Sequence, residues 1–372
     1  MLTRRTFGLL AWGALALPLA GCGGSMPASA IPADEKPAFV AAQIDDILKN
    51  QQDTQAAGLA ILLRKDGATV YSGSKGLAQA AQGTQITGNT VFQLASVSKP
   101  ITAIAVMRLA DAGRLSLDDT ARQWLPDLPA SWSAITVRQL LAHRSGVPDY
   151  IANVPVAQVP RLDGLTNAGL LQRFAQDPRL DFLPGTAAAY SSSNYVLLAE
   201  IIARAAGQSY AEHLRATLFE PLGMRATYVA GAAVPAGISQ ALNFASLTTT
   251  WGIHLLTVGD MGIFSSVADM DLLLRAFRGG QLVSAATARA MTVAQSGQAV
   301  NPAGEFYGFG WLVPGNITQP AVYAHSGQKD GFRSLVRINQ QQDLELVMLS
   351  NGGEASLRVM NAVRGVVQQA WE

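Results

Sequence analysis

Apolar positions recur with two different periods along the chain. Over residues 37–50 they return at helical spacing, which predicts a helix. The runs 58–64 and 68–77 are instead rich in β-forming residues, and residues 65–67 between them contain Asp-Gly. An Asp-Gly turn flanked by such runs predicts a β-hairpin.

The middle of the chain, about 101–300, has mostly helical periodicity, broken by loops that contain Pro and Gly. A helix is predicted to start near Ser96 and to stop at Gly113. Ser209 and Glu212 have the spacing of a capping box at the start of another helix. Further helices are predicted over 137–142, 195–206 and 269–277.

β character returns near the end of the chain, over 307–313, 321–325, 331–338 and 344–349, before a last helix over about 355–371. Strands therefore lie at both ends, with helices between them. This order predicts an α+β fold with one antiparallel sheet built from both chain ends, flanked by helices, and a mostly helical lobe inserted into it. We assign 38–95 and 305–372 to the sheet lobe and 96–304 to the helical lobe, with a cleft where the lobes meet.

The first residues have the pattern of an export signal. A basic start at Arg4 and Arg5 precedes an apolar stretch that ends in small residues, and the Arg pair resembles a twin-arginine signal. Leu19-Ala20-Gly21-Cys22 resembles a bacterial lipobox, in which Cys22 becomes the lipidated first residue. We therefore expect a signal over 1–21, a flexible tether over 22–37, and a periplasm-facing lipoprotein of the bacterial cell envelope. The alternative is cleavage after 28–30, which would release a periplasmic protein without a lipid.

The composition narrows the classes of function. Of 372 residues, 49% are hydrophobic and 14% charged, with a formal net charge of +1, which excludes a disordered chain and argues against a nucleic-acid partner. The single cysteine allows no intrachain disulfide, and the four histidines are scattered without metal-ligand spacing. We expect no metal and no cofactor. The expected partners are a small-molecule or peptide substrate, and a membrane through the lipid at Cys22.

The motif Ser-x-x-Lys occurs three times, starting at Ser72, Ser96 and Ser326. Ser72 falls in a predicted strand, where positions i and i+3 point to opposite faces, and Ser326 falls at a predicted strand end. Only Ser96 precedes a convincing helix, on which positions i and i+3 share a face and Lys99 can accept a proton from the serine. Taken alone, the pattern is equally that of an N-cap serine followed by an exposed lysine.

Two later segments, Tyr190-Ser191-Ser192-Ser193-Asn194-Tyr195 and His325-Ser326-Gly327, decide between these readings. Together with the sequence around them, these motifs resemble the serine β-lactamase and penicillin-binding protein family. The segments that carry the resemblance are FQLASVSKPITAIAVMRLADAGRLSLDD, ITVRQLLAHRSGVPDY, PGTAAAYSSSNYVLLAEII, MGIFSSVADM, YGFGWLV and HSGQKDGFRSL. The resemblance is to its class C branch, which also holds D-alanyl-D-alanine carboxypeptidases and esterases, and it covers about 38–370.

The resemblance implies a role for each matching residue. Ser96 is then the acylated nucleophile, Lys99 its base, and Tyr190 the group that relays protons to the leaving group and the deacylating water. His325-Ser326-Gly327 stands where relatives have Lys-Thr-Gly or His-Thr-Gly on the strand that flanks the cleft. The backbone N–H groups of Ser96 and Gln328 would form the oxyanion hole.

Two positions depart from the family pattern. Ser192 replaces an asparagine whose amide would reach a substrate carbonyl, and His325 replaces a lysine, with Arg333 on the next strand as a partial substitute. We therefore expect an acyl-enzyme hydrolase of small esters or D-amino-acid peptides, with weak β-lactamase activity. The alternative is a protein of the same fold that binds or is acylated without useful turnover.

Overall fold

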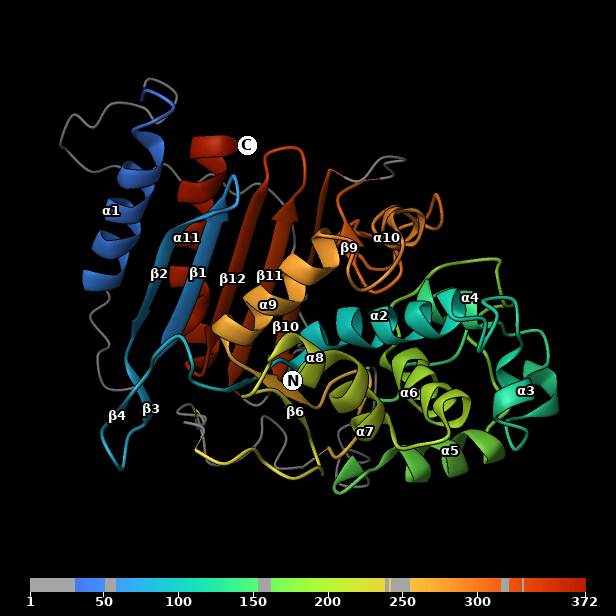
Figure 1. Cartoon of the computed structure of the whole chain (residues 1–372). Helices are drawn as coiled ribbons and strands as arrows, with labels where there is room; N and C mark the ends of the chain where they lie inside the picture. The colour runs from blue at the N-terminus through green and yellow to red at the C-terminus, as the bar shows by residue number, and fades with distance from the viewer. Residues whose placement is uncertain are drawn as a thin grey trace, which may run out of the picture.

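The computed structural model describes residues 31–50, 58–152, 162–237, 241, 255–315, 321–329 and 331–372. Its centre is a seven-stranded antiparallel sheet in the order β2-β1-β12-β11-β10-β9-β8, in which the N-terminal pair β2-β1 joins the C-terminal strands at β12, so both chain ends build one sheet as predicted (Figure 1). The strands are β1 Leu59–Lys65, β2 Ala68–Lys75, β8 Phe306–Tyr307, β9 Leu312–Val313, β10 Val322–Lys329, β11 Phe332–Asn339 and β12 Leu344–Ser350.

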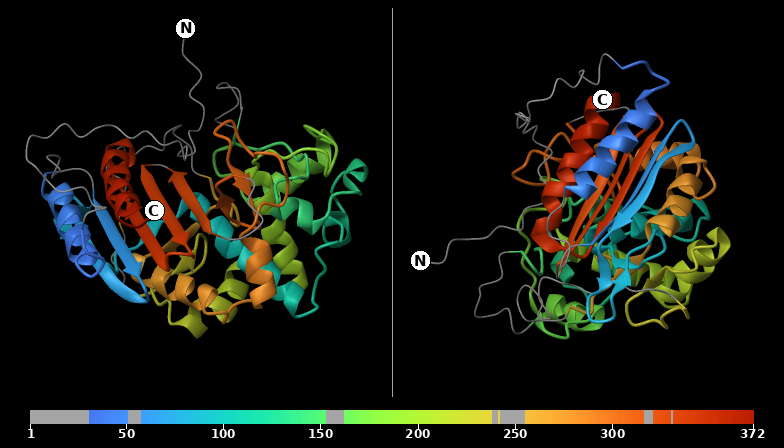
Figure 2. Two further views of the ribbon diagram at one scale, coloured as in Figure 1. Left: turned by 90° about the horizontal axis from the view of Figure 1, so that it is seen from above. Right: turned by 90° about the vertical axis from the view of Figure 1, so that its left-hand side faces the viewer.

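Both faces of this sheet are covered, which explains why its central strands are buried at almost every position. On β1, Leu59, Ile61 and Leu63 belong to one hydrophobic cluster with α1 (Lys36–Lys49) and α11 (Gly353–Trp371). The alternate residues Ala60 and Leu62 belong to the second, larger cluster on the opposite face. Helices α1 and α11 lie side by side over the outer face (Figure 2).

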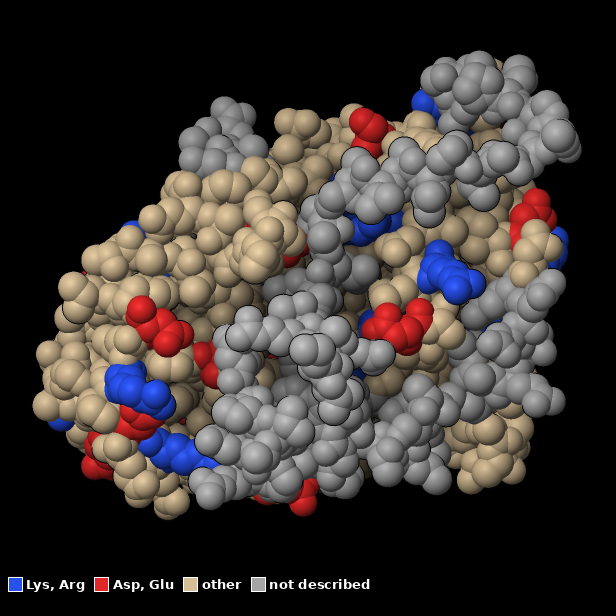
Figure 3. Space-filling model, turned by 180° about the vertical axis from the view of Figure 1, so that it is seen from behind, with Lys and Arg blue, Asp and Glu red and all other residues tan. Residues whose placement is uncertain are grey.

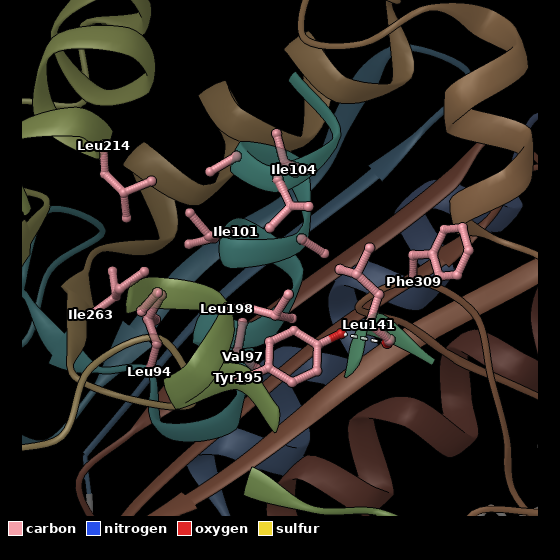
Figure 4. Close-up of a cluster of buried hydrophobic side chains, with 14 of the residues drawn as sticks. Leu94, Val97, Ile101, Ile104, Leu141, Tyr195, Leu198, Leu214, Ile263 and Phe309 are labelled. Atoms are coloured by element: carbon pink, nitrogen blue, oxygen red, sulfur yellow. Dashed lines mark hydrogen bonds between the residues drawn. The ribbon is translucent and has the colours of Figure 1, made fainter. Parts of the chain in front are cut away.

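The larger cluster joins the inner face of the sheet to the helical region. Helix α9 (Val267–Arg278) packs across β1 and β12, and α2 (Ser98–Asp111) runs from the sheet into the helical region against α6 (Ser192–Ala206) (Figure 1). Figure 4 shows Ile101 of α2, Leu198 of α6 and Ile263 converging in this core. The remaining helices are α3 Ala121–Trp124, α4 Val137–Leu141, α5 Asn167–Gln176, α7 Tyr210–Leu214, α8 Glu220–Leu222 and α10 Ala285–Met291.

Two strand predictions were wrong in their bounds. The segment predicted as one strand over 307–313 forms two short strands, because Gly310 takes φ +88° and a Cβ there would lie 2.6 Å from the Cβ of Ala103 on α2. The strand predicted to end at His325 continues to Lys329, so Ser326 lies inside β10.

The short paired strands were not predicted from the sequence. Strands β3 (Leu77–Gln79) and β4 (Thr84–Gln85) pair with each other, and β5 (Phe92–Gln93), β7 (Ile263–Ser265) and β6 (Tyr228–Val229) form a three-stranded sheet. Strands of two or three residues are too short to show a period. The capping box at Ser209 and the helix stop at Gly207, which adopts φ +70°, are both present.

The predicted export signal, Cys22 and most of the tether lie outside the described residues. In the part of the chain that the structure describes, no helix combines the length and hydropathy needed to cross a bilayer. The face in Figure 3 carries few charged side chains, and the visible basic and acidic groups are interspersed.

Candidate active site

Ser96 lies in a 3-10 turn, Ala95–Val97, that leads into helix α2. It is only partly buried, whereas Lys99, one turn later, is fully buried. The Lys99 ammonium donates to Ser96 Oγ at 3.2 Å, to Ser192 Oγ at 3.4 Å and to the Asp260 carbonyl oxygen at 2.9 Å. Three neutral oxygens from three different segments therefore fix the amine beside the candidate nucleophile.

The turn that carries Ser96 is pressed against β10. Ala95 has φ +48°, a left-handed conformation that costs a non-glycine residue about 1 kcal/mol or more. A Cβ on Gly327 would lie 2.3 Å from the Leu94 carbonyl oxygen, which already accepts from Ser334 Oγ at 2.6 Å, and 3.1 Å from the Ala95 Cβ. Only glycine fits at 327, because the turn that carries Ser96 packs directly against β10 at this point.

Tyr190 precedes helix α6 and approaches Lys99 from the side of the helical region. The Lys99 amine lies 5.0 Å from the centre of the Tyr190 ring. The Tyr190 hydroxyl oxygen is buried, yet no atom among the described residues hydrogen-bonds to it at ordinary geometry. Burial raises the pKa of Tyr190, while the nearby Lys99 charge and the Ser96 hydroxyl lower it. A protonated phenol without a fixed partner is thus directed toward Ser96 and Lys99.

His143 holds the Tyr190 loop from behind. Its Nδ1 accepts from the Ser191 backbone N–H at 3.1 Å, so the neutral ring carries its proton on Nε2. Burial, with smaller contributions from Lys99 and His325, holds the pKa of His143 well below its usual range. Its ring centre lies 4.4 Å from that of Tyr190. These contacts make His143 a framework residue of the Tyr190 loop.

Asn194 does not supply the amide that Ser192 lacks. Its side-chain oxygen accepts from Ser145 Oγ at 2.6 Å, and its side-chain nitrogen lies 3.1 Å from His143 Nδ1. Asn194 is 1% exposed, so its amide is committed to the loop framework. Within this segment, it is the Ser192 hydroxyl that accepts a hydrogen bond from the Lys99 amine at 3.4 Å.

His325 is fully buried inside β10 and has both ring nitrogens occupied. Nδ1 lies 2.8 Å from the Ser326 carbonyl oxygen, which can only accept, so Nδ1 donates and Nε2 accepts from the Tyr307 hydroxyl at 3.0 Å. Burial and the Lys99 charge lower the pKa of His325 to about 3, against the favourable effect of the Ser326 contact. The ring is therefore neutral, and a direct contact with substrate would require one of these bonds to break.

The other predicted binding residues lie on the second half of β10. Strand β9 pairs with β10 at Ala324, and Ser326, Gly327 and Gln328 lie beyond that pair, on the part of the edge that meets the Ser96 turn. Arg333, opposite Gln328 on β11, forms an ion pair with Glu354 and bonds the Gln328 side-chain oxygen at 3.0 Å. Arg333 is 5% exposed and already paired with Glu354 and Gln328, so its guanidinium is not available to bind a substrate carboxylate.

Three site residues were missed by the sequence analysis. Asp149 accepts from the Ser192 backbone N–H at 3.1 Å, and Tyr150 donates to the fully buried Asp260 carboxylate at 2.9 Å. Burial raises the pKa of both aspartates, and Lys99 opposes that rise in both. Lone Asp and Tyr residues in loops carry no spacing signal, although GVPDY was part of a segment that resembles the family.

The other two Ser-x-x-Lys motifs do not form such a site. Ser72 is exposed on β2, and the Lys75 amine donates to the Leu48 carbonyl oxygen at the end of α1. Ser326 and Lys329 lie on one extended strand, where Lys329 contacts Leu255 and Met261. Over the described ranges, no three His, Cys, Asp or Glu side chains come together as a metal site.

The fold and the Ser96, Lys99 and Tyr190 geometry describe a serine hydrolase, and comparison with known proteins identifies the family. The Beta-lactamase family model matches residues 44–369, so the chain belongs to that family of serine hydrolases. This confirms the family resemblance, the α+β fold and the assignment as an enzyme.

Among sequence relatives, Penicillin-binding protein 4* of Bacillus subtilis is 27% identical over 79% of this chain and 68% of its own length. Esterase EstB of Burkholderia gladioli is 33% identical over 50% of this chain and 51% of its own length. The D-amino acid amidase of Ochrobactrum anthropi SV3, solved with L-phenylalanine amide, superposes with a TM-score of 0.71 at 23% identity, covering 89% of this chain and 97% of the amidase. The last likeness concerns the fold alone.

Proposed function

We propose that this chain is an exported serine hydrolase that forms an acyl-enzyme at Ser96 and hydrolyses small esters or amides, including those of D-amino acids. The observation that carries the proposal is the 3.2 Å hydrogen bond between the buried Lys99 amine and the partly exposed Ser96 hydroxyl. A structural lysine has no need of burial beside an accessible hydroxyl, because desolvating its charge is costly.

Acylation begins when Ser96 Oγ attacks the substrate carbonyl carbon. The hydroxyl proton passes to the neutral form of the Lys99 amine, whose nitrogen lies 3.2 Å from Ser96 Oγ. The carbonyl oxygen becomes an oxyanion, which the backbone N–H groups of Ser96 and Gln328 stabilise. Such preorganised donors are commonly the largest single contribution to catalysis.

Collapse of the tetrahedral intermediate breaks the bond to the leaving group. The Tyr190 hydroxyl, which has no fixed partner, donates its proton to the departing oxygen or nitrogen and recovers a proton from Lys99. In deacylation a water attacks the acyl carbon, gives its proton to the Tyr190 and Lys99 pair, and Ser96 leaves with a proton returned from that pair. The enzyme is restored and the acid product is released.

The electrostatics around β10 favour substrates without an essential carboxylate. The neutral His325 and the Arg333 paired with Glu354 leave little positive charge at the place where the resemblance puts a lysine. Penicillins and D-alanyl-D-alanine peptides both carry a carboxylate next to the scissile bond. Small esters and amides do not, and the relative named esterase supports this preference.

A panel of three substrates tests the proposal. Initial hydrolysis rates would be measured for a nitrophenyl butyrate, a D-phenylalanine amide and a chromogenic cephalosporin. We expect steady turnover of the ester, slower turnover of the amide, and the lowest kcat/KM for the cephalosporin. A stoichiometric burst with all three and no steady turnover would instead support the alternative of a protein that is acylated without useful catalysis.

We also propose export and lipid attachment at Cys22. In a bacterial host, Cys22→Ser should move the protein from the membrane fraction to the soluble periplasmic fraction, because the acyl chains provide the anchor. Fractionation with an intact-mass measurement checks both the location and the missing lipid. Membrane retention of Cys22→Ser, or a wild-type mass without acyl groups, would contradict this part of the proposal.

A further inference from the structure

The segment 257–263 binds the nucleophile helix along its first turns. Four hydrogen bonds join it to α2 and to the turn before it: Thr102 Oγ1 to the Gly259 carbonyl at 2.7 Å, Lys99 Nζ to the Asp260 carbonyl at 2.9 Å, the Ile263 N–H to Ser98 Oγ at 3.2 Å, and the Leu94 N–H to the Ile263 carbonyl at 2.9 Å. On its other side, a Cβ at Gly259 would lie 2.4 Å from the Tyr195 carbonyl of α6. The segment is therefore wedged between the two helices that carry Lys99 and Ser192.

At the centre of this wedge lies the Asp260 carboxyl, which is 0% exposed. Its Oδ2 accepts from the Tyr150 hydroxyl at 2.9 Å, and that hydroxyl is also 2.6 Å from Thr257 Oγ1. Its Oδ1 has no hydrogen-bond partner among the described residues. A buried carboxyl with one unpartnered oxygen is costly to the fold, so its presence here requires a reason.

We propose that Asp260, held by Tyr150, is a positioning residue for Lys99: its backbone carbonyl fixes the amine on Ser96, and its buried carboxylate balances the ammonium charge. The inference rests on the proposed function, since it concerns the base of that reaction. The carboxylate does not contact Ser96 or the place of the substrate. It acts through the position and the protonation of Lys99.

Other ionisable groups around Lys99 also contribute to the electrostatic potential at its amine. Asp149 is a second acid within electrostatic reach, whereas His143 and His325 are neutral rings, because burial lowers the pKa of both. Lys329 also lowers the pKa of Asp260. Tyr190 and Tyr195 present their rings to the amine. Asp260 differs from Asp149 in that the same residue supplies both the carbonyl and the charge.

The test compares Asp260→Asn with Asp269→Asn in the full chain. Asparagine can still accept from Tyr150, so the substitution removes the charge and keeps the position. Loss of a nearby negative charge favours deprotonation of the catalytic pair, so we expect the acid limb of kcat/KM for a nitrophenyl ester to move down by about one pH unit. Asp269, also buried and bonded to Ala226 and Thr227 at the start of α9, is the matched control and should leave the limb in place.

A folded Asp260→Asn protein with an unchanged acid limb would overturn the inference and leave the proposed function intact. Failure of the wild type to hydrolyse either esters or amides would refute the proposed function itself. If Asp260→Asn does not fold, Tyr150→Phe replaces it: the carboxyl stays but loses its donor, so a smaller fraction is ionised. We then expect a smaller shift in the same direction, and an unchanged limb again contradicts the inference.

Discussion

Two clusters of charged groups, one beneath α9 and one at the cleft, differ in the kind of partner that each charge has. Beneath α9, Arg278 pairs with Asp343 of the β11–β12 turn and approaches Glu345 of β12 at 3.5 Å. At the cleft, the partners of the Lys99 amine among the described residues are hydroxyl and carbonyl oxygens, and the carboxylates of Asp149 and Asp260 act on it only through charge.

The two clusters differ in whether the cation can exchange its proton with a neighbouring group. A guanidinium does not release its proton in a protein, so the charges under α9 hold a helix on the sheet. A lysine bonded to a serine hydroxyl has an adjacent atom with which to exchange a proton. Burial by itself therefore does not identify a catalytic group. A buried group is a catalytic candidate when it can exchange a proton with a neighbouring group that is partly exposed to solvent.

The largest effect is expected at Ser96. Replacing it by alanine should lower kcat for an activated ester by roughly 10⁴-fold or more, since loss of the nucleophile disables the whole catalytic unit. Steady-state hydrolysis and a thermal melt of the same preparation check activity and folding together. Ser72→Ala, at the exposed Ser-x-x-Lys motif on β2, is the control and should retain wild-type rates.

Changes in the cluster under α9 should alter the free energy of unfolding rather than the rate of ester hydrolysis. Glu345 is fully buried, and neither carboxylate oxygen has a hydrogen bond from the residues that the structure describes. Burial, aided by repulsion from Asp271, raises its pKa to about 7. The native state therefore binds more protons than the unfolded state between the ordinary pKa of 4.5 and about 7. Over that window the contribution of Glu345 to the free energy of unfolding should fall by about 3 kcal/mol as the pH rises.

Glu345→Gln should flatten this pH dependence while leaving ester hydrolysis close to wild type. Urea unfolding at pH 5, 6, 7 and 8 measures it, with Glu220→Gln at an exposed pair as the control. An unaltered slope in Glu345→Gln would show that Glu345 stays ionised throughout and is compensated by Arg278.

The smallest effect concerns substrate preference at Ser192. Ser192→Asn should give a substrate amide carbonyl one more donor, worth about 0.5–1.5 kcal/mol, or roughly three- to tenfold in rate. Penicillin acylation should rise by that factor relative to acylation by a simple ester, because both reactions share Ser96 and the oxyanion hole. Second-order acylation rates for both compounds on both proteins decide it. An equal ratio would mean that residue 192 does not face the substrate.

The sequence predicted the parts of the fold that have a long period or a strong turn signal. The hairpin of β1 and β2, helices α6 and α9, and the pairing of both chain ends in one sheet all follow from such patterns. The break between β8 and β9 could not be predicted, because it depends on the contact of Gly310 with α2. Short strands such as β5 and β7 are stabilised by their neighbours and not by their own residues.

Some residues of the site could likewise be predicted from the sequence and others could not. Ser96 and Lys99 are linked by helical spacing, and Tyr190, Ser192 and His325 by resemblance, so their proximity could be anticipated. Asp149, Tyr150 and Asp260 reach Lys99 through loops whose paths only tertiary packing determines. Nor did the sequence indicate that Tyr307 and the Ser326 carbonyl would occupy both nitrogens of His325.

The most direct test of the central claim is to map the residue that a fluorophosphonate modifies. The reagent reports an activated serine whatever the natural substrate is, and peptide mass spectrometry locates the adduct. The account predicts one stoichiometric adduct, on the peptide that contains Ser96, and its absence in Ser96→Ala. An adduct on the Ser72 or Ser326 peptide, or undiminished labelling of Ser96→Ala, would contradict it.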